Sequence, residues 1–252
     1  MFSLQDKKAL VTGAAQGIGF GVAGALARQG ASVAVLDLTQ EAVDHAVQAI
    51  AEETDATVIG VVVDVTDVES VAHAIEETTS RLGGLDVAVN NAGVGNATAT
   101  LATTDEEWRR VYDVNVDGMF YCCRAEARWM LDNGVRGSLI NTVSISAQIS
   151  VPQHQTPYNS SKSAALGLTR SLANELAPAG IRVNSVSPGF TLTPMVRTER
   201  MRPQHDQWRG LTPLGRLAEV DDLVGGYVYL ASDAAAFTTG HDLVIDGGYT
   251  LR

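Results

Sequence analysis

Two patterns of apolar residues alternate along the chain. Short runs rich in Val, Ile, Leu and Ala end at turn residues, and between them lie longer stretches with apolar residues at helical spacing. The short runs predict strands near residues 9–12, 32–36, 57–63, 86–90, 138–143, 182–187 and 242–245. The longer stretches predict helices over residues 18–29, 40–53, 68–81, 105–131, 158–176 and 220–230.

This regular alternation of strands and helices predicts an α/β fold. Several strand runs are apolar throughout, as in parallel strands that helices cover on both faces. No polar linker, charge block or internal repeat interrupts residues 1–252, so we expect a single doubly wound domain. In such a domain the ligand binds at the carboxyl ends of the strands.

The region from about residue 190 to 213 lacks a clear period. We interpret it as a mobile lid over the ends of the strands, and an ordered surface excursion is the alternative. The region contains three prolines and four arginines, namely Pro194, Pro203, Pro213, Arg197, Arg200, Arg202 and Arg209.

Composition and charge narrow the class of protein. Hydrophobic residues make up 45% and charged residues 19% of the chain, which is typical of a folded globular protein. The formal net charge of −11 opposes binding to nucleic acid or to an anionic membrane surface, so we expect neither as a partner. The first residues carry no signal-like apolar stretch, and no later run approaches about 18 apolar residues. We therefore expect a cytoplasmic protein.

The cysteines and histidines indicate no metal site. Cys122 and Cys123 are adjacent, which suits neither a disulfide framework nor a metal-binding spacing, so we interpret them as small apolar side chains of a helix. The five histidines show no ligand spacing either. No metal is expected.

Three glycines follow the first predicted strand and lead directly into a helix, in the sequence Thr12-Gly13-Ala14-Ala15-Gln16-Gly17-Ile18-Gly19. Glycines let the backbone turn tightly and approach a pyrophosphate, and the free N–H groups of the helix N-terminus receive its negative charge. Asp37 ends the second predicted strand, where a carboxylate can accept hydrogen bonds from the hydroxyls of an adenosine ribose. Together these features predict a dinucleotide site.

Asp37 also favours NAD over NADP. A 2′-phosphate beside this carboxylate would suffer like-charge repulsion unless a basic residue offset it. Gln16 and Leu38 stand at neighbouring places where Arg or Lys could have served a phosphate. We therefore expect NAD as the cofactor.

Two more strand ends reach the same edge of the predicted sheet. Asp64-Val65 follows the third strand, and the Asp64 carboxylate could lie near the adenine amino group or cap the next helix. Asn90-Asn91-Ala92-Gly93 ends the fourth strand, where Gly93 permits close backbone approach. Asn90 could equally be a structural bridge between strands.

Tyr158 and Lys162 are four residues apart at the start of a predicted helix, so the phenol and the ammonium share one face. A neighbouring cation, helped by the positive charge of the nicotinamide, favours phenolate and lowers the pKa of Tyr158 from near 10, so that Tyr158 can exchange a proton with an alcohol or carbonyl oxygen. Taken alone, this pair is more typical of a solvated helical face, so its context matters.

Ser144 and Asn115 supply that context. Ser144 follows the fifth predicted strand, so its hydroxyl should emerge where it can hydrogen-bond a reacting oxygen, although nearby Ser146 is an alternative. Asn115 lies inside a long predicted helix, an unfavourable place for Asn unless its side chain or a local distortion has a specific role.

In their order along the chain, these motifs resemble the series that marks the short-chain dehydrogenase/reductase family. They are Thr12–Gly19 (the pattern TGxxxGxG), Asp64, Asn90–Gly93, Asn115, Ser144, Tyr158–Lys162 and Pro188-Gly189. The resemblance spans essentially the whole chain. It implies a seven-stranded Rossmann-type sheet, hydride transfer between a nicotinamide and a secondary alcohol or ketone, and a homotetramer.

The resemblance also implies roles for particular residues. Tyr158 would be the acid/base, Ser144 would orient the carbonyl, Lys162 would bind the nicotinamide ribose, and Asn115 would anchor a proton-relay water. Thr193 would lie near the nicotinamide carboxamide, whereas Thr191 stands where the family commonly has Ile or Val. The residues expected to bind the dinucleotide are Gly13, Gln16, Gly17, Ile18, Gly19, Asp37, Asp64, Val65, Asn91, Ala92, Gly93, Tyr158, Lys162, Pro188, Gly189, Thr191 and Thr193.

The loops expected around the substrate are polar. Candidate substrate contacts are Asn96, Ser146, Gln153 and His154, and burying such groups favours a substrate with several hydroxyls. The stretch from Pro152 to Asn159 resembles that of polyol dehydrogenases and ketose reductases. We therefore expect a sugar alcohol or ketose.

Two alternatives remain open. A 3-oxoacyl-thioester or other hydroxy-acyl reductase would use the same motifs, and the arginines of the lid favour it. A dinucleotide-binding regulator without catalysis would normally lack Tyr158, Lys162 or Ser144, all of which are present.

Overall fold

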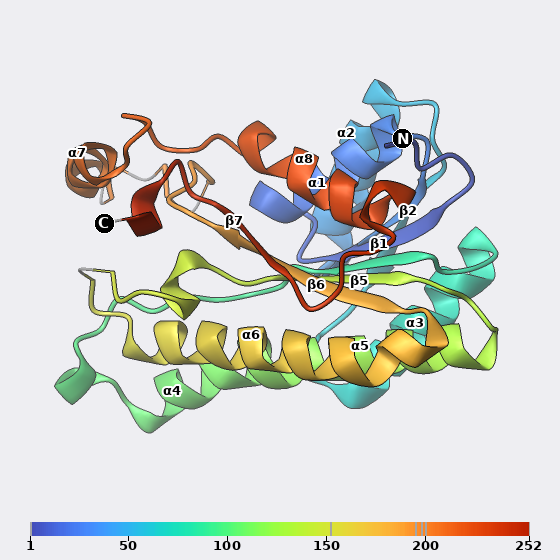
Figure 1. Cartoon of the computed structure of the whole chain (residues 1–252), viewed down its shortest axis with the longest axis horizontal. Helices are drawn as coiled ribbons and strands as arrows, with labels where there is room; N and C mark the ends of the chain where they lie inside the picture. Colours follow the sequence, from blue (N-terminus) through green and yellow to red (C-terminus); the bar gives the residue numbers. More distant parts are fainter. Residues whose placement is uncertain (1, 152, 195, 198, 200, 252) are drawn as a thin grey trace.

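The computed structural model describes residues 2–151, 153–194, 196–197, 199 and 201–251. Among these residues, seven strands form one parallel sheet in the order β3-β2-β1-β4-β5-β6-β7, which confirms the predicted α/β fold (Figure 1). The strands are β1 Lys8–Thr12, β2 Ser32–Asp37, β3 Val58–Val62, β4 Val87–Asn90, β5 Ser138–Thr142, β6 Arg182–Pro188 and β7 Asp242–Ile245. From β1 the chain builds the sheet outward in one direction to β3 and then, starting with β4, in the other direction. A doubly wound sheet binds its ligand at the carboxyl ends of the strands on either side of this reversal, here β1 and β4.

Helices cover both faces of the sheet (Figure 1). The helices α1, α2 and α8 lie on one face, and α3, α5 and α6 lie on the other. The longer helical elements are α1 Gly17–Arg28, α2 Gln40–Glu53, α3 Val68–Leu82, α4 Asp105–Tyr112, α5 Met119–Asp132, α6 Thr156–Leu176, α7 Arg202–Leu211 and α8 Asp221–Ala231.

Alternation along β1 shows how the sequence builds two apolar cores. Leu10 packs into the core under α3, α5 and α6, whereas its neighbours Ala9 and Val11 pack into the core under α1 and α8. All three side chains are fully buried. Burying a leucine side chain stabilises a fold by about 1.5–3 kcal/mol, so a strand covered on both faces must be apolar throughout.

Local signals set the ends of α3. The Asp67 carboxylate accepts hydrogen bonds from the backbone N–H groups of Glu69 and Ser70, so Asp67 caps this helix. At the other end Gly83 has φ +78°, a left-handed conformation that ends the helix.

The predicted helix over residues 105–131 is interrupted. It consists of α4, a wider π-helical segment over Asp113–Gly118, and α5. The wider turn admits Asn115, which is fully buried and hydrogen-bonded to neighbouring segments. The local distortion that an Asn at this place suggested is therefore present.

The predicted lid contains regular structure that the sequence pattern did not reveal. Helix α7 occupies Arg202–Leu211, with Pro203 in its first turn, where a proline removes no helical hydrogen bond. Trp208 of this helix is buried and stacks on Phe190, with ring centroids 4.3 Å apart. Met195, Thr198 and Arg200, which belong to the same predicted lid, lie outside the described residues. The mobility of the lid stays a prediction.

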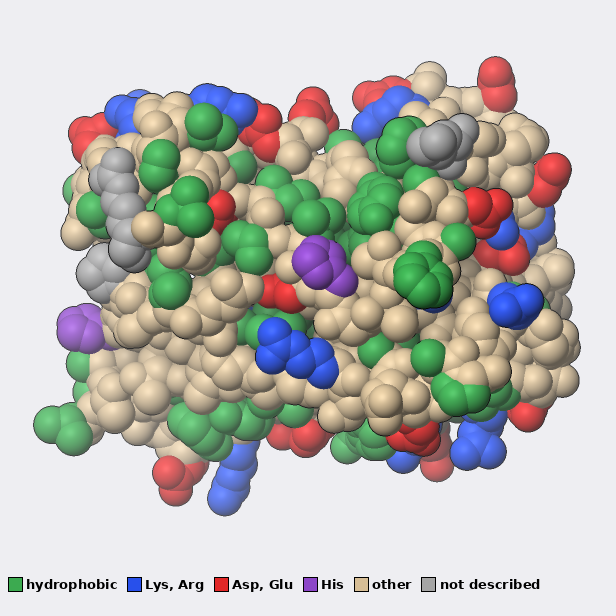
Figure 2. Space-filling model, viewed as in Figure 1, with side chains coloured by type: hydrophobic (Ala, Val, Ile, Leu, Met, Phe, Trp, Pro, Cys, Tyr) green, Lys and Arg blue, Asp and Glu red, His purple; other side chains and the backbone are tan. Residues whose placement is uncertain are grey.

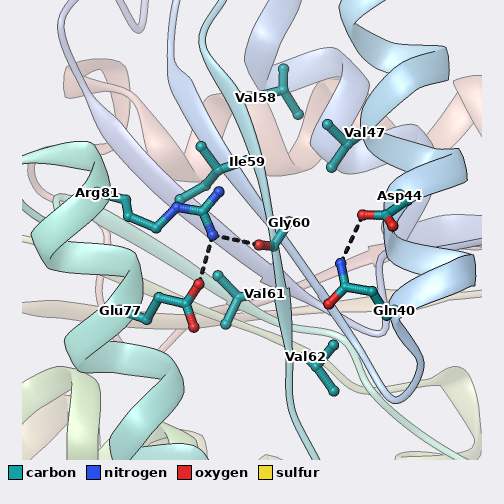
Figure 3. Close-up of a pocket in the computed structure, with 10 residues that line it drawn as sticks. All are labelled: Gln40, Asp44, Val47, Val58, Ile59, Gly60, Val61, Val62, Glu77 and Arg81. Carbon is teal, nitrogen blue, oxygen red and sulfur yellow. Dashed lines mark hydrogen bonds and ion pairs between the residues drawn. The ribbon is translucent and has the colours of Figure 1, made fainter.

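One of the two edge strands of the sheet is β3. A hollow of about 340 Å³ lies along this edge, between α2 and α3 (Figure 3). The Arg81 guanidinium crosses it, donating a 2.7 Å hydrogen bond to the Gly60 carbonyl and pairing with Glu77. Arg81 thereby satisfies one of the edge carbonyls that would otherwise face water.

A bilayer-spanning helix, which would have to be both long and apolar, does not occur among the described residues.

Candidate active site

The glycine-rich turn between β1 and α1 packs against the end of β4. Gly13 has φ +61°, and a Cβ at this position would lie 2.8 Å from the Ala92 Cα. A larger residue at Gly13 would therefore be strained and would push the two segments apart. The turn ends at the N-terminus of α1, whose first N–H groups have no partner within the helix and can hold an anion.

Thr12 and Asn91 fasten this turn. The Thr12 hydroxyl accepts hydrogen bonds from the N–H groups of Asn91 and Ala92, at 3.0 and 3.1 Å. In return, the Asn91 amide donates to the carbonyls of Thr12 and Gly13, both at 3.1 Å. The predicted cofactor residues at the ends of β1 and β4 therefore form one cradle.

The segment after β6 reaches the same turn. The Thr193 side chain lies 3.6 Å from the place that a Cβ on Gly17 would occupy. Thr191 is buried, and its hydroxyl donates to the Gly189 carbonyl. Gly189, which follows Pro188 at the end of β6, bonds through its N–H to Ile245 of β7. These four predicted residues are thus brought to the cofactor end, with Thr193 against the glycine turn.

Asp37 is held in place at the end of β2. Its carboxylate accepts hydrogen bonds from the N–H groups of Ala15, at 2.9 Å, and of Leu38, at 2.8 Å. It forms no ion pair within the described part of the chain. Gln16 is exposed and Ile18 packs against the core, so neither of these residues places a cation beside Asp37.

Asp64 and Val65 differ in their surroundings. Asp64 is exposed, and its carboxylate accepts from the N–H and the hydroxyl of Thr66. Capping of α3 falls to Asp67, so the capping alternative for Asp64 is wrong. Val65 is buried, 2.9 Å from the position of a Cβ on Gly118.

The four candidate catalytic side chains converge below this cradle. A Cβ on Gly93 would lie 3.3 Å from the side-chain oxygen Oδ1 of Asn115 and 3.5 Å from the Lys162 Nζ. Lys162 is buried, and its Nζ lies 5.7 Å from the centre of the Tyr158 ring. The spacing of Tyr158 and Lys162 on α6 therefore places both groups at the strand ends, as the sequence predicted.

Asn115 links the π-helical segment to its neighbours. Its amide donates to the Val94 carbonyl at 2.9 Å and to the Ser161 hydroxyl at 3.0 Å, while its oxygen accepts from the Val94 N–H. The Ser161 hydroxyl in turn donates to the Tyr158 carbonyl. Ser161 was not among the residues predicted from the sequence. Its signal was its place three residues after Tyr158, from which a helical hydroxyl reaches back to a carbonyl.

Ser144, rather than Ser146, stands beside the phenol. The Ser144 hydroxyl interacts with Tyr158 and favours its ionised form. Ser146 contributes its backbone N–H, which donates to the Ser144 oxygen at 3.1 Å. Both serines are buried, so Ser146 helps to hold Ser144 in position.

Burial governs the ionisation of the two central groups. It raises the pKa of Tyr158, and the interaction with Ser144 offsets only part of that rise. Burial also lowers the pKa of Lys162 to about 8. The protein groups alone therefore do not produce the predicted lowering of the Tyr158 pKa, because loss of hydration outweighs the hydrogen bond with Ser144.

A second layer supports the site from below. The Lys162 ammonium donates to the Thr142 carbonyl at 2.8 Å, and the Thr142 hydroxyl shares a 2.9 Å hydrogen bond with the hydroxyl of Tyr227 on α8. Tyr227 is fully buried, and burial raises its pKa. Tyr227 was not singled out from the sequence, because its distance from the motifs along the chain hides this contact.

The candidate substrate residues separate into two groups. Asn96 is buried, its oxygen accepts from the Tyr158 N–H at 3.4 Å, and its Nδ2 is buried without a hydrogen-bond partner. The Nε2 of Gln153 is likewise buried without a partner. His154 is exposed, whereas Pro152 of the same loop lies outside the described residues. The structure therefore brings Asn96 to Tyr158 and leaves His154 at the surface.

Comparison with known proteins agrees with this geometry. A family model described as enoyl-(acyl carrier protein) reductase matches residues 13–250. The galactitol 2-dehydrogenase (L-tagatose-forming) of Cereibacter sphaeroides is 39% identical over 253 residues, covering 100% of this chain and 98% of the relative. A short-chain type dehydrogenase/reductase from Mycobacterium marinum has a TM-score of 0.96 and 43% identity, covering 100% of this chain and 98% of that structure.

The chain belongs to the short-chain dehydrogenase/reductase family, whose members are oxidoreductases that act on CH–OH groups with a nicotinamide dinucleotide. The family does not by itself specify the dinucleotide. A relative from Hypocrea jecorina, 35% identical and covering 100% of this chain and 95% of its own length, is named NADP-dependent mannitol dehydrogenase.

Proposed function

We propose that this chain is an NAD(H)-dependent oxidoreductase that interconverts a sugar alcohol and a ketose, with Tyr158 as the acid/base. The observation that carries this proposal is the convergence of Tyr158, Ser144, Asn115 and Lys162 beside Gly93. These residues lie directly below the cradle formed by Thr12, Gly13, Asn91 and Ala92.

The cradle fits a dinucleotide. Gly13 and Gly19 leave no room for a side chain of their own beside Ala92 and Asn91, and the first N–H groups of α1, which have no partner within the helix, could hold a pyrophosphate. A nicotinamide dinucleotide held by this cradle would supply the hydride acceptor for oxidation of the alcohol and the hydride donor for reduction of the ketone. The residues of the chain manage the proton and hold the reacting oxygen.

In the oxidation, Tyr158 takes the hydroxyl proton as the C–H bond gives up its electron pair. Ser144 donates a hydrogen bond to the oxygen that becomes the carbonyl, and it orients that oxygen toward Tyr158. Lys162 places a buried positive charge on the same side, which favours the phenolate form when Tyr158 releases its proton. Asn115 holds the Val94 backbone and Ser161 beside this path.

Asp37 supports NAD rather than NADP. Its carboxylate is already fixed by two N–H groups, and each oxygen retains acceptor capacity for a ribose hydroxyl. A 2′-phosphate would meet this charge beside exposed Leu38 and Gln16, neither of which can offset it.

Buried polar groups support a polyhydroxy substrate. Asn96 Nδ2 and Gln153 Nε2 are donors that lack acceptors, and a buried donor without an acceptor is costly. Hydroxyl oxygens flanking the reacting carbon would satisfy them. The galactitol and mannitol dehydrogenases named above act, by their names, on substrates of this kind.

The acyl-thioester alternative is weakened by the ion pairs that three arginines of the lid form. Arg197 pairs with Glu219, Arg202 with Glu199 and Arg209 with Asp206. Each of these cations already faces a carboxylate, which reduces its attraction for the phosphates of a carrier.

The first test measures initial rates with NAD and with NADP on a panel of four- to six-carbon polyols, apolar secondary alcohols and a 3-hydroxyacyl thioester. Polyol turnover with NAD well above the other combinations is expected. Activity confined to the thioester would favour the alternative, and absence of turnover with intact dinucleotide binding would favour the regulator.

We also propose a homotetramer. Apolar side chains are exposed on α4 and α5, including Trp108, Phe120 and Leu131, with exposed fractions of 40%, 36% and 48%. Light scattering tests the state of the full chain, and a monomer at micromolar concentration would contradict this proposal.

A further inference from the structure

Glu126 of α5 is a fully buried carboxyl group outside the proposed reaction path. Its Oε2 accepts a 3.0 Å hydrogen bond from the Asn90 amide at the end of β4. Its Oε1 has no hydrogen-bond partner, and neither does the Asn90 Oδ1. The same pair of side chains therefore contains two buried acceptor oxygens and lacks one donor.

The surroundings of Glu126 offer no compensating charge. It forms no ion pair within the described residues, and its own helix places the buried thiols Cys122 and Cys123 beside it, with Arg124 and Arg128 exposed. The strands β4 and β5 present the neutral amides of Asn90 and Asn141. The charged side chains of α3, the other helix packed here, are exposed, namely Glu69, His73, Glu76, Glu77 and Arg81. On α6 the neighbouring side chain is the Thr169 hydroxyl, while buried Lys162 bonds to Thr142.

The pair is part of a network that joins four elements. The Asn90 amide also donates to the Asn141 oxygen at 3.2 Å, and the Asn141 amide donates to the Thr169 hydroxyl at 3.0 Å. The network therefore connects α5, β4, β5 and α6. These elements carry or adjoin the whole candidate site, because Asn91–Gly93 follow β4, Ser144 follows β5, Tyr158 and Lys162 lie on α6, and Asn115 precedes α5.

We propose that Glu126 is held as a neutral carboxylic acid in a two-point pair with the Asn90 amide, and that this pair positions the end of β4 under the dinucleotide. A proton on Oε1 supplies the missing donor, and the free acceptor in the same pair is Asn90 Oδ1. Without that proton both oxygens would remain unsatisfied in an apolar core, which is costly. Glu126 is a positioning residue, because it acts through Asn90.

Protonation of Glu126 makes the position of β4 sensitive to pH. Burial raises the pKa of Glu126 from 4.5 to about 7. The folded protein then binds this proton more tightly than the unfolded chain does. The stability that the acid form contributes is therefore full below about pH 4.5 and is lost as the pH rises through about 7.

Glu126→Gln tests the proposal, because glutamine keeps the shape and donates to Asn90 Oδ1 at every pH. The melting temperatures of the variant and the native protein are expected to match near pH 5, and at pH 8 the variant should melt at least about 4 °C higher. NADH should bind equally to both at pH 6, and several-fold more tightly to the variant at pH 8.5. Glu175→Gln, an exposed change of the same charge on α6, is the control and should show neither trend.

Infrared difference spectroscopy provides a second readout in the native protein. A carboxylic acid carbonyl band should disappear between pH 6 and pH 8.5, and Glu126→Gln should lack this change. A melting difference that stays constant from pH 5 to 8, or a Glu126→Gln protein that fails to fold, would overturn the proposal. NADH binding and infrared spectra do not depend on the alcohol substrate, so failure here is distinguishable from failure of the proposed function.

Discussion

The Lys162 ammonium lies 3.5 Å from the place that a Cβ on Gly93 would occupy, although these residues belong to α6 and to the segment after β4. A side chain at residue 93 would therefore compete with the buried cation for the same space. This contact joins the cofactor end of the site to its chemical end.

Figure 2 shows the surface of the same side of the molecule as Figure 1, where acidic, basic and apolar side chains are interspersed.

Tyr158→Phe removes the proton-transfer hydroxyl and little else. We expect turnover to fall by about 100- to 10,000-fold, the usual contribution of a positioned acid/base. NADH binding should persist, since the contacts of the cradle remain. Steady-state rates and a fluorescence titration with NADH measure the two effects, and near-native turnover would refute the assignment of Tyr158.

Lys162→Met removes a cation whose burial lowers its pKa to about 8. Folding lowers this pKa, so burying the charged lysine reduces the stability of the native protein at neutral pH. This loss of stability disappears as the pH rises from about 8 toward 10.5 and the lysine becomes neutral. The variant should therefore be at least as stable as the native protein at pH 7, while turnover falls steeply. Between pH 7 and 10 the melting temperature of the native protein should rise relative to that of the variant. A difference in melting temperature that does not change with pH would contradict this.

Gly13→Ala combines a positive φ of 61° with a Cβ only 2.8 Å from the Ala92 backbone. We expect a loss of about 1–3 kcal/mol of stability and weakened NADH binding. Gly225→Ala is the matched control, because no atom lies within 4 Å of its Cβ and it sits within α8. It should stabilise the protein by up to about 1 kcal/mol. Urea unfolding measures both changes.

Asp37→Ser together with Leu38→Arg replaces the repulsive carboxylate by a side chain that can pair with a phosphate. The ratio of kcat/KM for NAD to that for NADP should fall by about tenfold or more, which corresponds to about 1.4 kcal/mol. Leu38→Arg alone keeps the carboxylate and should shift the ratio less. An unchanged ratio in the double variant would show that Asp37 does not select the dinucleotide.

Gln153→Leu removes a buried donor that lacks an acceptor in the protein. The KM for a polyol should rise by about fivefold, equivalent to about 1 kcal/mol, whereas the KM for an apolar secondary alcohol should not. His154→Ala, at the exposed neighbouring residue, should leave both values unchanged. Equal effects on the two substrates would place Gln153 outside the substrate site.

Local sequence was sufficient for much of the fold and of the candidate site. The alternation of apolar runs predicted the parallel sheet and most helix ends within one or two residues, because both depend on burial and turn residues that are near in sequence. The glycine turn, Asp37, and the Tyr158–Lys162 pair were visible for the same reason. The helix α7 was not, because its stability depends on Trp208 packing against the distant Phe190.

What the sequence determined by itself is therefore the set of chemical groups and the secondary structure that carries them to one edge of a sheet. Only the tertiary structure decided the ionisation of these groups and which residues hold them in place. It placed Thr142 and Tyr227 under Lys162, brought Thr193 against Gly17, and closed Glu126 into a core beside Asn90. Hydration, charge and hydrogen bonding at these groups depend on which distant segments cover them, and no spacing along the chain contains that information.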